Sequence, residues 1–347
     1  MTLMEKEILE QPKVLASVKK NNADTIDKLV KAIEDKGDIK LCYFAARGTS
    51  DHASIYAQYL IGKYVGVPSA LATCSVITAY EGKLDLSNAL VIGVSQSGCA
   101  ADGLAVMERG KQCGAITVAV TNDESSPMAK AADFHLFCNA GEEKSVAATK
   151  TFTSQMYALA LFIAKWAHNT ELEKGLDKVP DAVGEFMETL PAELDKLVPL
   201  FRYMDEGFTL GRGYDYPIAL ESALKLQETN YVKMKGAAVS DFHHGPFAQV
   251  EEGTPVILYC NKGPVEKDAV EMLNKLDGVE AEVVLVTDDK ELAATRKYAV
   301  VTPDLGNDAL GVYCNAVFAQ YFACKLTAVK GRNPDAPRGL KKVTITK

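Results

Sequence analysis

A buried-strand pattern that ends in a polar, glycine-containing turn constrains this chain more than any other feature. Residues 89–94 are apolar and rich in β-branched side chains, and Ser95-Gln96-Ser97-Gly98 follows them directly. A helical stretch from Asp102 to Arg109 comes next. Such a strand, turn and helix form the repeating unit of a parallel α/β sheet, and the turn offers N–H groups and hydroxyls to an anion. We therefore predict a phosphate-binding loop here, the alternative being an ordinary strand-to-helix turn.

The same alternation of β-rich and amphipathic runs fills both halves of the chain, which predicts parallel sheets covered by helices. In the first half, strands are predicted at 39–46, 68–74, 89–95, 115–121 and 134–138, with helices near 51–64, 102–112 and 149–168. In the second half, strands are predicted at 207–211, 255–261, 282–287 and 298–302, with helices near 216–231, 265–276 and 311–329. Ala46-Arg47-Gly48 matches Gly211-Arg212-Gly213 at an offset of 165 residues (47 to 212), so we predict an internal duplication.

We predict the α/β class, with two tandem flavodoxin-like, doubly wound parallel sheets flanked by helices. The predicted segments are a helical N-terminal segment at 1–35, a first domain at 36–170, a helical connector at 171–200, a second domain at 201–330 and an extended C-terminal tail at 331–347. Pro334 and Pro337 exclude a helix in that tail, for which a frayed, solvated end is the alternative.

Composition restricts the partners of the chain. No run of the 347 residues is apolar enough to cross a membrane, and residues 1–7 lack the features of a signal peptide, so we expect a cytoplasmic protein. A net charge of −8 argues against nucleic acid and anionic membranes but permits one phosphorylated small molecule. The eight cysteines lack metal-site spacing; we predict buried, reduced thiols, and neither a metal nor a cofactor.

Charged residues on the predicted helix near 216–231 are candidates for proton transfer. Glu221, Lys225 and Glu228 are spaced i, i+4 and i+7 and share one face, which a surface ion-pair ladder also explains. His243 and His244 stand just before Gly245-Pro246, in a predicted loop. A carboxylate and a histidine in one pocket can move a proton at a sugar carbon and another at the ring hydroxyl.

Together these motifs resemble the sugar isomerase (SIS) superfamily, specifically the isomerase module of glucosamine-6-phosphate synthase, glucosamine-6-phosphate deaminases and fructosamine-6-phosphate deglycases. The resemblance runs essentially from end to end. It is carried by residues 46–50, 94–98, 141–150, 210–213, 221–228, 244–246 and 337–342.

The resemblance implies a role for each matching residue. Glu228 would move a proton between C1 and C2, with Glu221 and Lys225 lining the pocket. His244 would open the sugar ring and come from the neighbouring subunit of a homodimer. Lys342 would fold over the substrate and engage its carbonyl carbon. The residues that would bind the sugar and its phosphate are Gly48, Thr49, Ser50, Ser95, Gln96, Ser97, Val146 and Ala148.

Two departures from the family pattern leave the substrate open. Cys99-Ala100 replaces the Glu-Thr that often continues the family's phosphate loop, and Ala148 stands where many synthases have serine. The chain also enters the isomerase-like region almost at Met1. We therefore expect it not to hydrolyse glutamine itself; a separate glutaminase subunit is an alternative.

We predict the conversion of glucosamine 6-phosphate into fructose 6-phosphate and ammonia. Deglycation of a fructosamine 6-phosphate, such as fructoselysine 6-phosphate, would use the same glutamate and histidine, but Lys225 and Lys342 favour the first reaction. A non-catalytic phosphosugar-binding regulator is the third interpretation. The presence of Glu228, His244 and Lys342, and the lack of a DNA-binding segment, count against it.

Overall fold

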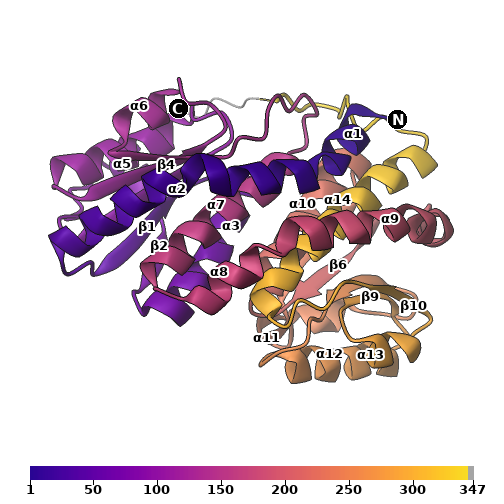
Figure 1. Cartoon of the computed structure of the whole chain (residues 1–347). Helices are drawn as coiled ribbons and strands as arrows, with labels where there is room; N and C mark the ends of the chain where they lie inside the picture. Colours follow the sequence, from indigo (N-terminus) through magenta and orange to yellow (C-terminus); the bar gives the residue numbers. More distant parts are fainter. Residues whose placement is uncertain (343–347) are drawn as a thin grey trace. The chain divides into compact units, whose positions relative to one another are not determined.

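The structure is a computed structural model that describes residues 1–342 and contains two parallel five-stranded sheets (Figure 1). The chain divides into two compact units, each of which holds one sheet. The first-sheet unit comprises Lys13–Glu143, Lys150–Asp177 and the chain from Lys341, and the second-sheet unit comprises Met1–Pro12, Lys144–Thr149 and Lys178–Leu340.

The first sheet has the strand order β2-β1-β3-β4-β5, and each neighbouring pair is parallel. Its strands are β1 (Leu41–Ala45), β2 (Ser69–Leu71), β3 (Ala89–Ser95), β4 (Ile116–Thr121) and β5 (Phe134–Phe137). This doubly wound order reverses between β1 and β3, and the carboxyl ends at such a switch point form the crevice in which these folds bind ligands. The loops after β1 and β3 therefore flank the crevice.

Alternate residues of each strand point to opposite faces of the first sheet. Because the strands are apolar on both faces, helices cover both of them. On one face Tyr43, Val91 and Ala119 pack with Val106 and Met107. The helical elements of this unit are most of α2 (Gln11–Lys36), α3 (Thr49–Leu60), η1 (Ile61–Val65), α4 (Cys74–Thr78), α5 (Ala101–Gln112), α6 (Pro127–Ala131), α7 (Lys150–Trp166) and α8 (Thr170–Leu176).

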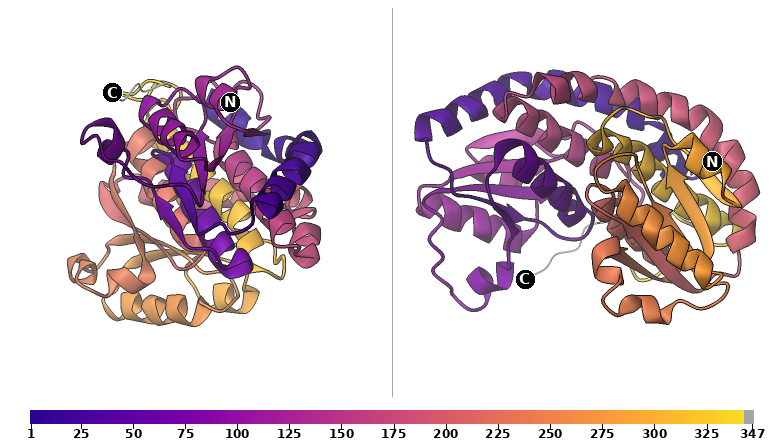
Figure 2. Two further views of the ribbon diagram at one scale, coloured as in Figure 1. Left: turned by 90° about the vertical axis from the view of Figure 1, so that its left-hand side faces the viewer. Right: turned by 90° about the horizontal axis from the view of Figure 1, so that it is seen from below.

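The second sheet repeats this topology, with the order β10-β9-β8-β6-β7. Its strands are β6 (Glu206–Gly211), β7 (Lys233–Ala238), β8 (Pro255–Tyr259), β9 (Glu282–Thr287) and β10 (Tyr298–Val301). In this unit α12 and α13 lie on one face of the sheet, with α10 and α14 on the other (Figures 1 and 2). The helical elements are α1 (Leu3–Leu9), α9 (Val179–Leu197), η2 (Val198–Phe201), α10 (Asp215–Asn230), α11 (Val239–Phe242), η3 (Pro246–Gln249), α12 (Glu266–Gly278), α13 (Lys290–Ala294) and α14 (Asp308–Val329).

An arginine–aspartate ion pair recurs in both units and supports the predicted duplication. Arg47 follows β1 and lies 2.7 Å from Asp102 on α5, and Arg212 follows β6 and lies 2.5 Å from Asp268 on α12. The two arginines are 165 residues apart (47 to 212) and the two aspartates 166 (102 to 268). The predicted α/β class with two doubly wound sheets is confirmed.

The sequence analysis missed one strand, β7, which lies at the edge of the second sheet beside β6. Its residues are lysines, a methionine and small residues, without the β-branched side chains on which the prediction depended. An edge strand is only partly buried, so lysine is tolerated there. Gly236 is needed at this place because a Cβ would lie 2.8 Å from the Cα of Leu220 in α10.

The prediction of eight buried thiols is wrong for two of them. All eight cysteines lie within the described residues and are unpaired, but Cys99 is exposed and Cys113 is half-buried. Cys99 belongs to the polar turn after β3, not to an apolar run. Over residues 1–342, no helix combines the length and apolar character of a membrane span.

Candidate active site

The turn after β3 is fixed by hydrogen bonds and carries half-buried polar side chains. Ser95 ends the strand, and its Oγ accepts the Gly98 N–H at 3.1 Å, while the Gly98 carbonyl accepts the Met128 N–H at 3.1 Å. Gly98 has a φ of 62°, and a Cβ there would lie 2.2 Å from Ser126 Oγ. Only glycine satisfies both the backbone angle and this close approach. Gln96 and Ser97 are half-buried, so their side chains remain accessible to a ligand.

A second loop, after β1, lies on the other side of the same crevice. Gly48, with a φ of 56°, is the N-cap of α3, and Thr49 and Ser50 are the first residues of that helix. Ser50 is buried, and its Oγ accepts a hydrogen bond from Gln155 of α7 at 3.1 Å. Because a helix N-terminus carries partial positive charge, the two loops offer both positive charge and hydrogen-bond donors to an anion. The structure thus brings the predicted phosphate-binding residues of the first-sheet unit to one switch point.

The equivalent crevice of the second sheet is filled by the chain itself. Asp215 stands 165 residues after Ser50, and Asn261 stands 166 after Ser95. The buried Asp215 carboxylate accepts the Asn261 N–H and Nδ2 at 3.1 Å each, and Asn315 Nδ2 at 2.8 Å. Burial raises the pKa of Asp215 to about 7, although these hydrogen bonds act to lower it. A protein carboxylate therefore occupies the position that corresponds to the anion loop of the first sheet.

The charged face of α10 is buried, so the surface-ladder interpretation is wrong. Lys225 Nζ lies 3.2 Å from Glu221 Oε1 and 2.6 Å from Glu228 Oε2. The side chains of Lys225 and Glu221 are fully buried, whereas that of Glu228 is 22% exposed. Burial lowers the pKa of Lys225, but the two carboxylates outweigh burial and raise it above its ordinary value. The lysine thus stays charged, and Glu228 alone of the three reaches solvent.

The C-terminal tail binds to the end of this helix and is not a frayed end over its described part. Arg332 donates to the carbonyl of Asn230, and the Arg338 N–H donates to the Tyr231 hydroxyl at 2.7 Å. Both guanidinium groups stack on the Tyr231 ring, 4.9 and 4.7 Å from its centroid. Cations near the C-terminus of a helix also interact favourably with the helix dipole, and cations above an aromatic ring with the face of the ring. Residues 343–347 of the predicted tail lie outside the described residues.

The segment with Val146 and Ala148 is held by residues that the sequence analysis did not single out. In the second-sheet unit the buried Glu7 carboxylate accepts from the backbone of Lys144 and Ser145 and from Ser145 Oγ. Gln320 donates to the Thr149 carbonyl at 3.1 Å. Glu7 lies in the helical N-terminal segment, where spacing alone gave no chemical signal. Val146 and Ala148 themselves are half-buried.

The two remaining predicted residues, Lys342 and His244, are each described within their own unit. Lys342, in the first-sheet unit, pairs with the buried Glu143 at 2.7 Å. His244 is exposed after α11 and lines a cavity of about 290 Å³ with Arg212, His243 and Lys275. Among the described residues no hydrogen bond joins His244 to Glu228. Its contribution across a subunit boundary therefore stays a prediction.

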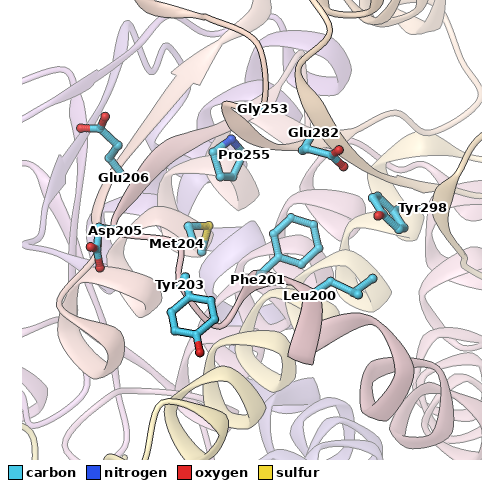
Figure 3. A pocket seen from close by; sticks show the side chains of 10 residues that line it. All are labelled: Leu200, Phe201, Tyr203, Met204, Asp205, Glu206, Gly253, Pro255, Glu282 and Tyr298. Carbon is cyan, nitrogen blue, oxygen red and sulfur yellow. The ribbon is translucent and has the colours of Figure 1, made fainter.

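A larger cavity, of about 540 Å³, lies at the amino ends of the second sheet's strands, opposite the Asp215 switch point (Figure 3). Its wall includes the first residues of β6, β8, β9 and β10, which are the amino ends of the strands. Figure 3 shows Phe201 in its centre, with the acidic side chains Asp205 and Glu282 around it. Lys330 and Lys297 of this chain already lie beside those two carboxylates. None of the predicted site residues lines this cavity.

Two doubly wound sheets, one with an open polar switch point and one with a buried Glu–Lys–Glu helix face, define an SIS-type protein. The chain belongs to this family, because the SIS domain model matches residues 38–165 and 205–330. The glutamine–fructose-6-phosphate aminotransferase (isomerizing) of Aquifex aeolicus is 31% identical over 345 residues, which cover 99% of this chain and 57% of that protein. This chain thus spans little more than half the length of that relative.

Solved structures show the same fold over nearly the whole chain. The C-terminal domain of glucosamine-fructose-6-phosphate aminotransferase from Francisella tularensis aligns with a TM-score of 0.87 and 27% identity, covering 97% of this chain and 98% of that chain. The glucosamine-6-phosphate deaminase of Thermotoga maritima aligns with a TM-score of 0.82 and 21% identity, covering 99% and 100%. The chain is therefore homologous to the isomerase domain of the aminotransferases.

Proposed function

We propose that this protein is a phosphosugar enzyme that moves a proton between C1 and C2 of a 6-phospho-amino sugar. Its proposed net reaction is glucosamine 6-phosphate plus water to fructose 6-phosphate plus ammonia. The observation that carries the proposal is the buried Glu221–Lys225–Glu228 cluster on α10. Two buried charges are costly to keep in a helix for stability alone. Homology to the isomerase domain of the aminotransferases adds support.

Glu228 is assigned as the base. The Lys225 ammonium donates a hydrogen bond to Glu228 Oε2 at 2.6 Å and so holds the carboxylate in place. In the open-chain aldose, Glu228 would take the proton from C2 and return it to C1, while the amino group loses one proton and O1 gains one, which leaves a hydroxyl at C1 and an imine at C2. Water then hydrolyses this imine to the ketone and ammonia, so that atoms and charge balance. The exposed part of Glu228 gives it access to the substrate.

Phosphate binding is assigned to Ser50, Ser95, Gln96 and Ser97, with Gly48 and Thr49 supplying the helix N-terminus. Hydrogen bonds from hydroxyl and N–H groups to a phosphate are charge-assisted and strong. Val146 and Ala148 are assigned to the sugar, Lys342 to its carbonyl carbon, and His244 of a homodimer partner to ring opening. These roles, and a cytoplasmic location, stay predictions.

One assay distinguishes the proposed reaction from deglycation. We expect ammonia release from glucosamine 6-phosphate to exceed lysine release from fructoselysine 6-phosphate. The reverse order would overturn the deaminase assignment in favour of a deglycase. Formation of glucosamine 6-phosphate from fructose 6-phosphate and ammonium chloride tests the synthetic direction, in which a separate glutaminase would supply the ammonia. Binding of either sugar without turnover would favour a phosphosugar-binding regulator.

A further inference from the structure

The lysine at the end of the described tail is bound to a carboxylate that is completely enclosed. Lys342 Nζ lies 2.7 Å from Glu143 Oε2, and the Glu143 side chain has 0% exposure while that of Lys342 has 23%. Both residues belong to the first-sheet unit. The preceding residue, Lys341, is exposed. Two adjacent lysines of the tail are therefore in different environments.

The Glu143 carboxylate is also held in place by hydrogen bonds from a residue of its own unit, Thr151. Thr151 donates its N–H to Oε1 at 3.1 Å and its hydroxyl to Oε2 at 2.7 Å. Thr151 lies in the first turn of α7, a helix of 17 residues, whose N-terminal dipole favours an anion. A buried carboxylate still benefits from a counter-charge. The tail lysine therefore meets a carboxylate that is already fixed.

We propose that Glu143 is a positioning residue that docks the ammonium group of Lys342 and takes up its proton during the reaction. The proposal rests on the proposed function, in which Lys342 engages the substrate carbonyl. An amine attacks a carbonyl only when it is neutral, and an ammonium needs an adjacent base to become so. Oε2 of Glu143 is at hydrogen-bond distance for that transfer.

Written from fructose 6-phosphate, in the reverse direction of the proposed reaction, the step at the C2 carbonyl balances without any further reactant. One proton moves from Lys342 Nζ to Glu143 Oε2, and the nitrogen lone pair then forms a bond to the carbonyl carbon while the carbonyl electron pair moves to oxygen. That oxygen takes the proton back from Oε2, which restores the carboxylate. Loss of water from the adduct then leaves a protonated imine between Lys342 and the sugar.

Competitive acetylation with acetic anhydride tests the docking without any assay of activity. The rates at Lys342 and Lys341 are compared by mass spectrometry in the full chain, with Lys341 as the internal control. In the wild type we expect slower modification of Lys342, and in Glu143→Gln an increase at Lys342 of about fivefold to tenfold. The exposed neighbour provides the matched control, Glu142→Gln, which should leave both rates unchanged. Equal effects of the two variants would overturn the docking.

Kinetics test the proton transfer and separate its failure from that of the proposed function. Glu143→Gln should lower kcat at least tenfold with little change in KM and should reduce borohydride trapping of fructose 6-phosphate on Lys342. Glu143→Asp keeps the charge, so its kcat and its trapping should lie between those of the wild type and of Glu143→Gln. If the Gln variant does not fold, the Asp variant still tests the proposal. Unchanged kcat and trapping in both variants would overturn the proton transfer. A wild type with protected Lys342 but no turnover would overturn the proposed function and the proton transfer, and leave the docking standing.

Discussion

Lys225 Nζ lies 2.6 Å from Glu228 Oε2, and of these two side chains only that of Glu228 reaches solvent. The pair thus combines a permanently buried cation with an accessible carboxylate. The ion pair thus fixes the Glu228 carboxylate and leaves part of it open to a substrate.

Replacing Glu228 by Gln keeps the size and polarity of the side chain but removes the base. We expect turnover of glucosamine 6-phosphate to fall by about 10²–10⁴ while the sugar still binds. Ammonia release and isothermal titration measure the two quantities. Near-normal turnover would exclude Glu228 as the base. Glu206→Gln, at an exposed position of the same unit, is the control.

Replacing Ser97 by Ala removes one hydroxyl from the turn after β3. A charge-assisted hydrogen bond is worth about 1.5–3 kcal/mol, so affinity for the phosphosugar should fall roughly tenfold to a hundredfold. Ser87→Ala, just before the amino end of the same strand, serves as the control. If both variants bind as the wild type does, the phosphate is held elsewhere.

Stability should depend on pH through Asp215, whose pKa burial raises to about 7. An unfolded aspartate has a pKa of about 3.9, so between about pH 4 and 7 the folded state binds more protons than the unfolded state. The free energy of unfolding therefore falls as pH rises through this window. Asp215→Asn should flatten that slope, measured by urea denaturation across the range. Asp241→Asn, at an exposed position, should leave the slope unchanged.

Cys99 should react faster with iodoacetamide than the other cysteines, because it is exposed whereas six are buried and one is half-buried. Burial also raises the pKa of Cys42 and Cys138 and disfavours their thiolates. Cys99 N–H donates to Ser97 Oγ at 3.3 Å, so a bound phosphate should shield it. Peptide mapping with and without glucosamine 6-phosphate measures both effects, and labelling that ignores the sugar would place the phosphate away from this loop.

Deletion of residues 339–347 should abolish turnover and lower the melting temperature, because the buried Glu143 loses its counter-charge, while the chain stays folded. The cut leaves the contacts that bind the tail to its own unit, including Asp335, which accepts the Leu3 and Met4 N–H groups at 2.8 and 2.9 Å. It removes Lys342 and also residues 343–347, which lie outside the described residues. A fully active truncated chain would refute the role of Lys342, and an unfolded one would make the tail structural.

Much of the fold follows from local patterns, because buried parallel strands are continuous apolar runs. Helical spacing also placed Lys225 and Glu228 on one face, but it carries no information on burial, which depends on packing against α14 and β7. The strand β7 escaped detection because an edge strand can consist of lysines and small residues.

The remaining site residues are defined by distant partners. Glu143 meets Lys342 across 199 residues of sequence, and Glu7 meets Ser145 across 138. The local periodicity of apolar residues carries no information about contacts between residues so far apart in the sequence. For the same reason Cys99, read as one more buried thiol, proved to be exposed beside the candidate phosphate loop.

The Asp215–Asn261–Asn315 cluster has a consequence for stoichiometry. Of the two corresponding switch points, the one in the second sheet holds the Asp215 side chain, which Asn261 and Asn315 bind. Titration with the phosphosugar should therefore saturate at one molecule per chain and not at two. The two sheets thus differ in what they present: the first has an accessible polar switch point, and the second carries the charged face of α10.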